Sequence, residues 1–305
     1  MIALHTFGYA LAIACSLSLL HAQESHLVGS SHGQHATQVL IRCDDFGMCH
    51  TVNMAVQQVI ATGFPLSVSV MVACPWFPEA VDILKQHPEV AVGVHLTLNA
   101  EWKDYRWGPV AGSSAVPSLV DSNGWFFPSR DLFFAHNPKR EQVEQELRAQ
   151  IDRAMRSGLR IDYLDYHMGT AVSTPELRLL VEQLATEYHL GVSRYFGEAD
   201  AGGWYAVSPD HKLDSLMAVT NRITPESTWL MVFHTGLDTP EMQALVDLNA
   251  FGLTEMSRHR AAELRALTSQ EFRNLLEERH LQPITYRDLI EKVGLRHMTR
   301  PDAEY

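Results

Sequence analysis

The stretch VLIRCDDFGMCHTVNMAVQQVIATG, residues 39–63, indicates the fold of this chain. It begins with an apolar run, Val39–Ile41, which predicts a buried strand that ends near Asp44 and Asp45. Apolar residues between positions 52 and 61 then recur at helical spacing, and a glycine follows them. A strand, an acidic turn and a helix in this order are typical of the first unit of an α/β fold.

The same alternation recurs along the rest of the chain. Apolar runs predict six further strands, at residues 66–73, 90–98, 159–164, 190–195, 228–233 and 283–285. Helical patterns lie between most of them, which predicts a parallel sheet covered by helices. Neither GxGxxG nor GxxxxGK[ST] follows the first strand, and this favours a barrel over a doubly wound sheet. We therefore predict an α/β fold, a TIM-like (β/α) barrel of about seven parallel strands in a single domain over residues 38–295.

Composition and charge exclude some classes of function. The chain has 305 residues, of which 46% are hydrophobic, so it can bury a core of ordinary size. Its 24 Lys and Arg residues against 36 Asp and Glu residues give a formal charge of −12. Nucleic-acid binding relies on Lys and Arg contacts with phosphates, so we expect no nucleic-acid partner.

The first residues predict a targeting segment. Residues 1–22 contain no Asp, Glu, Lys or Arg, and most of Phe7–Leu20 is apolar. This pattern predicts a signal peptide cleaved near Ala22, and therefore export to the periplasm or out of the cell. Residues 23–37 predict a polar linker, and residues 296–305 a C-terminal tail. No other stretch is apolar for long enough to predict a stable membrane span.

Three cysteines would remain after cleavage. Cys43, Cys49 and Cys74 are an odd number and form no CxxC pair, so they do not indicate a disulfide framework. One disulfide with one free thiol, or three buried thiols, would both fit this pattern.

Polar side chains gather where the predicted strands end. Catalytic groups of parallel barrels come from these carboxyl ends and from the loops that follow. The candidates are Asp44, Asp45, His95, Asp165, His167, Arg194 and His234. A single strand-end histidine more often stabilises structure than binds a ligand, but the whole set predicts one functional site.

Adjacent carboxylates favour a metal ion at this site. Two carboxylates do not readily ionise side by side without a counter-charge, and a divalent ion supplies one. Asp45, His95 and His167 would provide one oxygen and two imidazoles, and three protein ligands with open positions describe a catalytic metal site. Asp44 would then be left as a general base.

Several segments resemble the YdjC-like carbohydrate deacetylases, which include chitooligosaccharide deacetylase. IRCDDFGMCHTVNMAV (41–56) resembles their DDFG-x-x-x-x-x-N opening, and GVHLTL (93–98) their second motif. LDYHMG (164–169) is similar to their Asp-x-His motif and FHTGLD (233–238) to their His-Pro-Gly segment. Residues 257–289 resemble their C-terminal pattern of Arg, Glu-Leu and Leu-Thr. The resemblance therefore covers residues 39–289, nearly the whole chain after the predicted signal peptide.

The resemblance implies a distorted (β/α) barrel that holds one divalent metal ion, zinc or magnesium. It implies a hydrolase that removes acetyl groups from N-acetylated amino sugars or oligosaccharides. Carried over by motif, Asp45, His95 and His167 are the metal ligands, Asp44 is the base that activates a water, and His234 is the acid.

Some positions are less well defined by the family pattern. Gly169 stands where the family commonly has a second histidine, and Thr235 where it has proline. These replacements suggest different substrate contacts, so another acylated substrate would also fit. Arg194 is predicted either to hold Asp44 and lower its pKa or to form an ordinary ion pair at the rim.

The long segment 99–137 predicts an ordered flap because it contains Trp102, Trp107, Trp125, Phe126 and Phe127. These aromatic side chains would either stack on sugar rings or pack the loop against the barrel, and the same two readings apply to Trp204 and Tyr205.

Other functions fit parts of the pattern. A non-catalytic, exported carbohydrate-binding protein on a deacetylase scaffold predicts loss of a ligand or of the base. An iron oxygenase with a His/His/Asp site would leave Asp44 without a role. A metal-dependent sugar isomerase would need more carboxylates and a lysine. The sequence indicates neither the sugar nor the oligomeric state.

Overall fold

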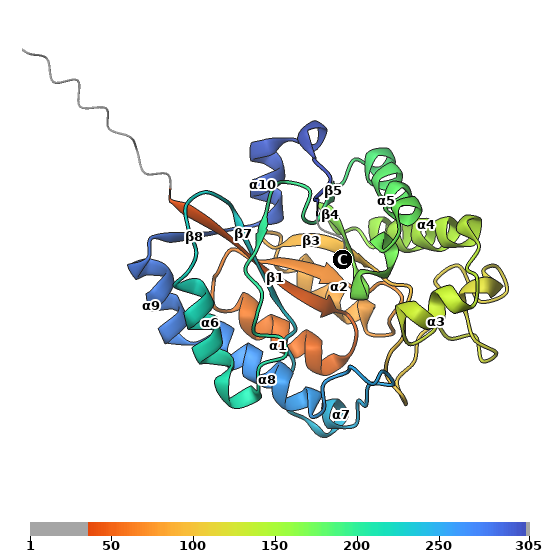
Figure 1. Ribbon diagram of the computed structural model, residues 1–305, viewed down its shortest axis with the longest axis horizontal. Helices are drawn as coiled ribbons and strands as arrows, with labels where there is room; N and C mark the ends of the chain where they lie inside the picture. Colours follow the sequence, from red (N-terminus) through yellow and green to blue (C-terminus); the bar gives the residue numbers. More distant parts are fainter. Residues whose placement is uncertain (1–35, 303–305) are drawn as a thin grey trace, which may run out of the picture. The chain divides into compact units, whose positions relative to one another are not determined.

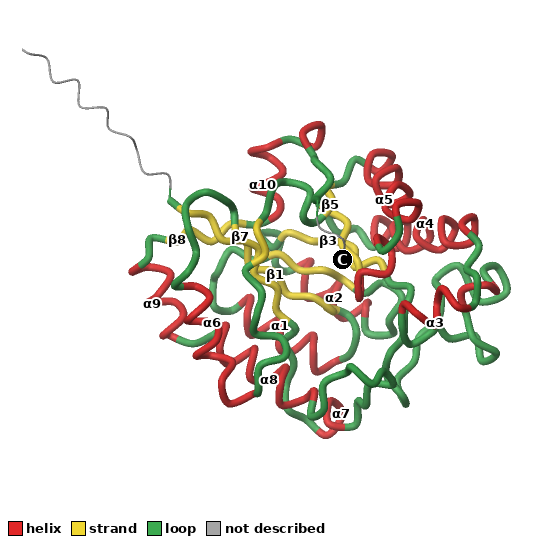
Figure 2. Tube along the Cα trace, in the orientation of Figure 1, coloured by secondary structure: helices red, strands yellow, loops and turns green. Residues whose placement is uncertain are grey.

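In the computed structural model, which describes residues 36–302, a parallel sheet lies at the centre and helices surround it (Figures 1 and 2). The strands are β1 (Thr37–Phe46), β2 (Ser67–Val70), β3 (Ala91–Leu96), β4 (Tyr163–Tyr166), β5 (Gly191–Val192), β6 (Ala199–Asp200), β7 (Trp229–Phe233) and β8 (Leu281–Ile284). The α-helices are α1 (His50–Ile60), α2 (Phe77–Lys85), α3 (Arg130–Ala135), α4 (Arg140–Arg156), α5 (Pro175–Tyr188), α6 (Lys212–Thr220), α7 (Pro240–Gln243), α8 (Met256–Leu267), α9 (Gln270–Glu278) and α10 (Tyr286–Val293). Four short 3-10 helices are η1 (Pro117–Leu119), η2 (His167–Val172), η3 (Pro209–His211) and η4 (Leu295–His297).

The strand order confirms the predicted fold class. The sheet runs β5-β4-β3-β2-β1-β7-β6, and β8 also pairs with β1. Every strand pairing in it is parallel. The sheet curls into a half-barrel, so the α/β single domain is a distorted (β/α) barrel. The sheet has one strand more than the seven predicted. This additional strand is the two-residue β6, which lies in a segment that shows no strand pattern in the sequence.

Alternation along β1 separates the two faces of the sheet. Val39 and Ile41 join the large core between the sheet and the helices. Leu40 belongs to a smaller cluster with residues of β3, β4, β7 and β8, which fills the inner side of the curl. Because side chains alternate along a strand, Arg42 and Asp44 follow Leu40 onto this inner side. The inner face therefore changes from apolar to charged toward the carboxyl end of β1.

Gly93 in β3 allows the ring of Tyr163 on β4 to pack against the strand. A Cβ atom at position 93 would lie 2.3 Å from Tyr163 Cε2. The Gly93→Ala variant is expected to lower the free energy of unfolding by about 1–3 kcal/mol, because an overpacked core must shift its side chains. Urea denaturation followed by circular dichroism measures this loss, and an unchanged midpoint would contradict it.

Helix caps agree with the sequence in one place and differ in another. Thr174 caps α5, as its Thr-Pro-Glu pattern predicts, by accepting a hydrogen bond from the Leu177 N–H. The sequence Thr268-Ser269-Gln270-Glu271 has the spacing of a capping box that begins at Thr268, but the N-cap of α9 is Ser269. A reciprocal box forms instead at α10, between Thr285 and Asp288.

The ends of the chain are only partly described. The predicted signal peptide lies outside the described residues, as does the linker up to residue 35, so both stay predictions. Part of the predicted C-terminal tail is ordered against the domain, because the Thr299 N–H donates to the Tyr195 carbonyl and Arg300 pairs with Glu182.

No helix within residues 36–302 is both long and apolar enough to cross a membrane. Cys43, Cys49 and Cys74 are buried free thiols, which selects the second of the two predicted cysteine arrangements.

Candidate metal centre

The end of β1 turns so that two adjacent carboxylates face one site. Asp45 adopts a left-handed backbone conformation with φ of 63°, and the β1–β2 register shifts between Cys43 and Phe46. A residue other than glycine in this conformation is uncommon and is concentrated at functional sites. Adjacent side chains on a regular strand point to opposite faces. Because the backbone turns at Asp45, the side chains of Asp44 and Asp45 both face the same site.

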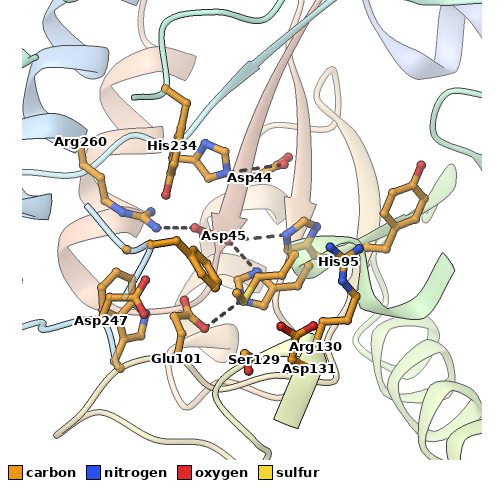
Figure 3. A pocket seen from close by; sticks show the side chains of 17 residues that line it. Asp44, Asp45, His95, Glu101, Ser129, Arg130, Asp131, His234, Asp247 and Arg260 are labelled. Carbon is orange, nitrogen blue, oxygen red and sulfur yellow. Dashed lines mark hydrogen bonds and ion pairs between the residues drawn. The ribbon is translucent and has the colours of Figure 1, made fainter. Parts of the chain in front are cut away.

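The three predicted ligands converge. The Oδ1 atom of Asp45 lies 3.5 Å from His95 Nε2 and 3.4 Å from His167 Nδ1. One ligand atom from each residue lies within 4.8 Å of the other two, and all three residues are buried. Figure 3 shows Asp45 between His95 and Arg260, with interactions drawn to both.

Carboxylates outside the ligand set orient both histidines. Asp165 lies 2.8 Å from His95 Nδ1, and Glu101 lies 3.0 Å from His167 Nε2. With these ring nitrogens donating, the nitrogen that faces Asp45 has a free lone pair in each neutral ring. In its neutral form, each imidazole is therefore held in the tautomer that a metal ligand requires.

Charge in this cluster is set by burial and by close partners. Burial raises the pKa of Asp45, but Arg260, whose Nη2 lies 2.6 Å from Oδ2, and His167 hold that pKa well below its usual range. Burial lowers the pKa of His167, but the negative charges of Glu101 and Asp45 outweigh it and raise the pKa to about 10. A proton on His167 thus balances charge that a metal ion would balance in its place.

The residues present fit a divalent ion. Asp45 Oδ1 is buried and has no hydrogen-bond partner within the described residues. With His95 and His167 neutral, as metal ligands would be, four buried acids (Asp44, Asp45, Glu101, Asp165) face two buried arginines (Arg42, Arg260), which leaves a formal charge of two minus four, or −2. Ligand atoms about 2.0–2.1 Å from a tetrahedral ion lie about 3.3–3.4 Å apart, close to the distances found here. The cluster is therefore capable of holding a metal ion.

Asp44 is held by an arginine that sequence reasoning missed. Arg42 donates from Nε to Asp44 Oδ1 at 2.6 Å and from Nη2 to Oδ2 at 2.8 Å. Arg194, which was predicted either to hold Asp44 or to form an ion pair at the rim, pairs with Asp200 at 2.5 Å. Its backbone φ of 72° turns the chain sharply after β5, and β6, which carries Asp200, follows. This agrees with the alternative prediction of an ion pair at the rim.

His234 directly follows β7 and faces Asp44 across the site. Its Nε2 atom lies 4.0 Å from Asp44 Oδ2, and Figure 3 shows the two side chains opposite each other. The His234 backbone N–H donates to Glu263 Oε2 at 2.7 Å, and the other oxygen of Glu263 accepts from Lys212. A buried ion pair therefore fixes the loop on which His234 sits.

These side chains open into one cavity of about 550 Å³. Its lining includes Asp44, Asp45, His95, His167 and His234, together with Glu101, Trp102, Ser129, Arg130, Asp131, Tyr166, Met168, Tyr205, Asp247, Phe251, Gly252 and Arg260. Five of the seven candidate site residues thus share one cavity, and Asp165 and Arg194 do not line it.

The aromatic side chains divide between packing and the cavity. Trp107, Phe126 and Phe127 are buried in the core, which favours packing over sugar contact for them. Trp102 is buried but lines the cavity, whereas Trp204 is buried and stacks on Phe233.

Removal of the Glu101 carboxylate tests how His167 is oriented. The Glu101→Gln variant is expected to bind zinc about 10–100-fold more weakly, because an amide holds the imidazole less firmly than a carboxylate does. Competition with a chromogenic chelator measures the Kd, with Glu89→Gln as a control at an exposed histidine–glutamate pair. Equal affinities for Glu101→Gln and the parent protein would refute this role.

The chain is similar to known proteins over most of its length. Residues 38–278 match the model of the YdjC-like protein family. A carbohydrate deacetylase of Brevibacillus brevis is 28% identical over 270 residues, which cover 83% of this chain and 99% of the relative. A carbohydrate deacetylase of Geobacillus stearothermophilus is 29% identical, with 82% and 96% of the two chains covered. A solved Enterococcus faecalis V583 structure, described as a candidate cellobiose-phosphate cleavage protein, superposes with a TM-score of 0.69 at 25% identity and covers 84% and 99%.

Proposed function

The chain belongs to the YdjC-like protein family, and from this premise we propose that it is a metal-dependent carbohydrate deacetylase. Its substrates would be N-acetylated amino sugars or oligosaccharides, since relatives that align over nearly their whole length are named carbohydrate deacetylases. One observation carries the proposal: the unpartnered oxygen of Asp45 faces a ring nitrogen of His95 and of His167, beside an Asp44 that is not needed as a ligand.

The proposed reaction is hydrolysis of an amide. A divalent ion held by Asp45, His95 and His167 would polarise the acyl carbonyl and favour deprotonation of the attacking water. Asp44 accepts the proton of that water, and Arg42 fixes the carboxylate in the orientation needed. His234 donates a proton to the departing amine from the other side of the cavity. General acid–base catalysis of this kind contributes about 10²–10⁴-fold to the rate.

Ligand chemistry favours zinc over magnesium. Two imidazoles suit zinc, whereas magnesium prefers oxygen ligands and octahedral geometry. The contacts of 3.4 and 3.5 Å are also closer to the spacing of tetrahedral ligands than to the roughly 3.0 Å between neighbouring ligands of an octahedral ion.

The proposed function is tested with a panel of N-acetylated mono- and oligosaccharides. The metal-free protein is reloaded with zinc or magnesium, and both free amine and acetate are measured. We expect equimolar amine and acetate with zinc and none after chelation. Sugar binding without release of acetate would instead indicate a non-catalytic carbohydrate-binding protein.

A further inference from the structure

Arg42 is a charged residue in the middle of the buried central strand. Its immediate neighbours on β1, Ile41 and Cys43, are apolar, and the residue is 3% exposed. A buried guanidinium is costly unless its N–H groups are paired, so its contacts define its role.

Those contacts reach two different carboxylates. Two bonds go to Asp44, as described above. Nη1 donates to Asp165 Oδ1 at 3.0 Å and to Ser193 Oγ at 2.5 Å. The guanidinium therefore uses three nitrogens to join Asp44 to a residue on β4, a strand three places away in the sheet.

Asp165 connects this network to the metal centre. Its second oxygen lies 2.8 Å from Nδ1 of His95, whose Nε2 faces Asp45. Any movement of Asp165 would therefore rotate or release a ligand. Arg42 fixes both the proposed base and the carboxylate that orients this ligand.

Arg42 also supplies the charge that a second ion could supply. Asp44, His95 and Asp165 each offer a ligand atom within 4.8 Å of the others. Both carboxylates of this second group already accept hydrogen bonds from Arg42. We therefore expect one metal ion per chain.

We infer that Arg42 is a positioning residue that fixes the Asp44 carboxylate directly and the His95 ring through Asp165. For Asp44 this rests on the proposed deacetylase function, whereas for His95 it concerns metal affinity alone. A lysine keeps the charge but has one nitrogen, and it cannot pair in fork geometry with Asp44 while reaching Asp165. An arginine is therefore required, and not only a positive charge.

The test compares Arg42→Lys with the parent protein. The zinc Kd is expected to rise about 10–100-fold, as for other residues that orient metal ligands. The kcat is expected to fall by at least tenfold while KM stays within about threefold, because the base and not the substrate contacts are disturbed. Arg42→Ala, assayed with millimolar guanidinium, adds a second arm in which part of both losses is restored.

Arg287→Lys is the matched control. Arg287 forms a similar fork with Asp162, from Nε at 3.0 Å and Nη2 at 2.9 Å, but does not line the cavity. We expect it to leave the zinc Kd and kcat within twofold of the parent values. The inference is overturned if Arg42→Lys retains the parent zinc Kd, or if Arg287→Lys causes the same losses. The zinc Kd tests the role of Arg42 even if the protein hydrolyses no acetylated sugar. Failure of the deacetylase proposal can therefore be told apart from failure of this inference.

Discussion

Asp44→Asn is expected to lower kcat about 10³-fold or more while the protein still binds one zinc ion per chain. The amide has nearly the same shape as the carboxylate but cannot accept the proton of the attacking water. Asp44 faces Arg42 and His234 and is not part of the Asp45, His95 and His167 set, so the metal should remain. Steady-state kinetics and elemental analysis on the same sample give both values.

Asp82→Asn is the control for this substitution, because Asp82 is exposed on α2. It should leave kcat unchanged. An Asp44→Asn protein with at least a tenth of the parent kcat would exclude Asp44 as the base. Loss of zinc from that protein would instead make Asp44 a ligand.

His95→Ala and His167→Ala are expected to lose the metal and, with it, the activity. Apparent zinc affinities of about 10–16 kcal/mol over four ligands imply about 2.5–4 kcal/mol for each, or roughly 60- to 10³-fold in Kd. Each deletion also leaves an orienting carboxylate, Asp165 or Glu101, without its histidine partner. Zinc titration with a competing chelator measures the effect.

His87→Ala provides the comparison, since His87 lies outside the cavity and pairs only with Glu89 among the described acids. It should bind zinc like the parent protein. Retention of parent affinity in either His95→Ala or His167→Ala would remove that histidine from the ligand set.

The sequence was informative where local chemistry is unusual. Paired carboxylates at the end of an apolar strand, and histidines at the ends of later strands, predicted that Asp44, Asp45, His95, His167 and His234 share a site. The structure places all five around one cavity. Parallel strands explain this success, because their carboxyl ends meet at one edge of the sheet.

Residues that support the site were harder to predict. Glu101 lies in the irregular 99–137 segment, where no periodicity indicates which way a side chain points. Arg260 lies on α8, a helix that the sequence analysis did not assign. Arg42 did carry a signal, since a charge inside an apolar strand must be paired when buried, and this would have favoured it over Arg194.

Anomalous diffraction from zinc-loaded crystals tests whether Asp45, His95 and His167 together hold one metal ion. We expect one peak per chain, about 2.0–2.2 Å from Asp45 Oδ1, His95 Nε2 and His167 Nδ1. With Asp44 and Asp165 still paired to Arg42, no second peak should lie between them. A peak coordinated by other residues, or no peak at saturating zinc, would show that these three residues do not form the metal site.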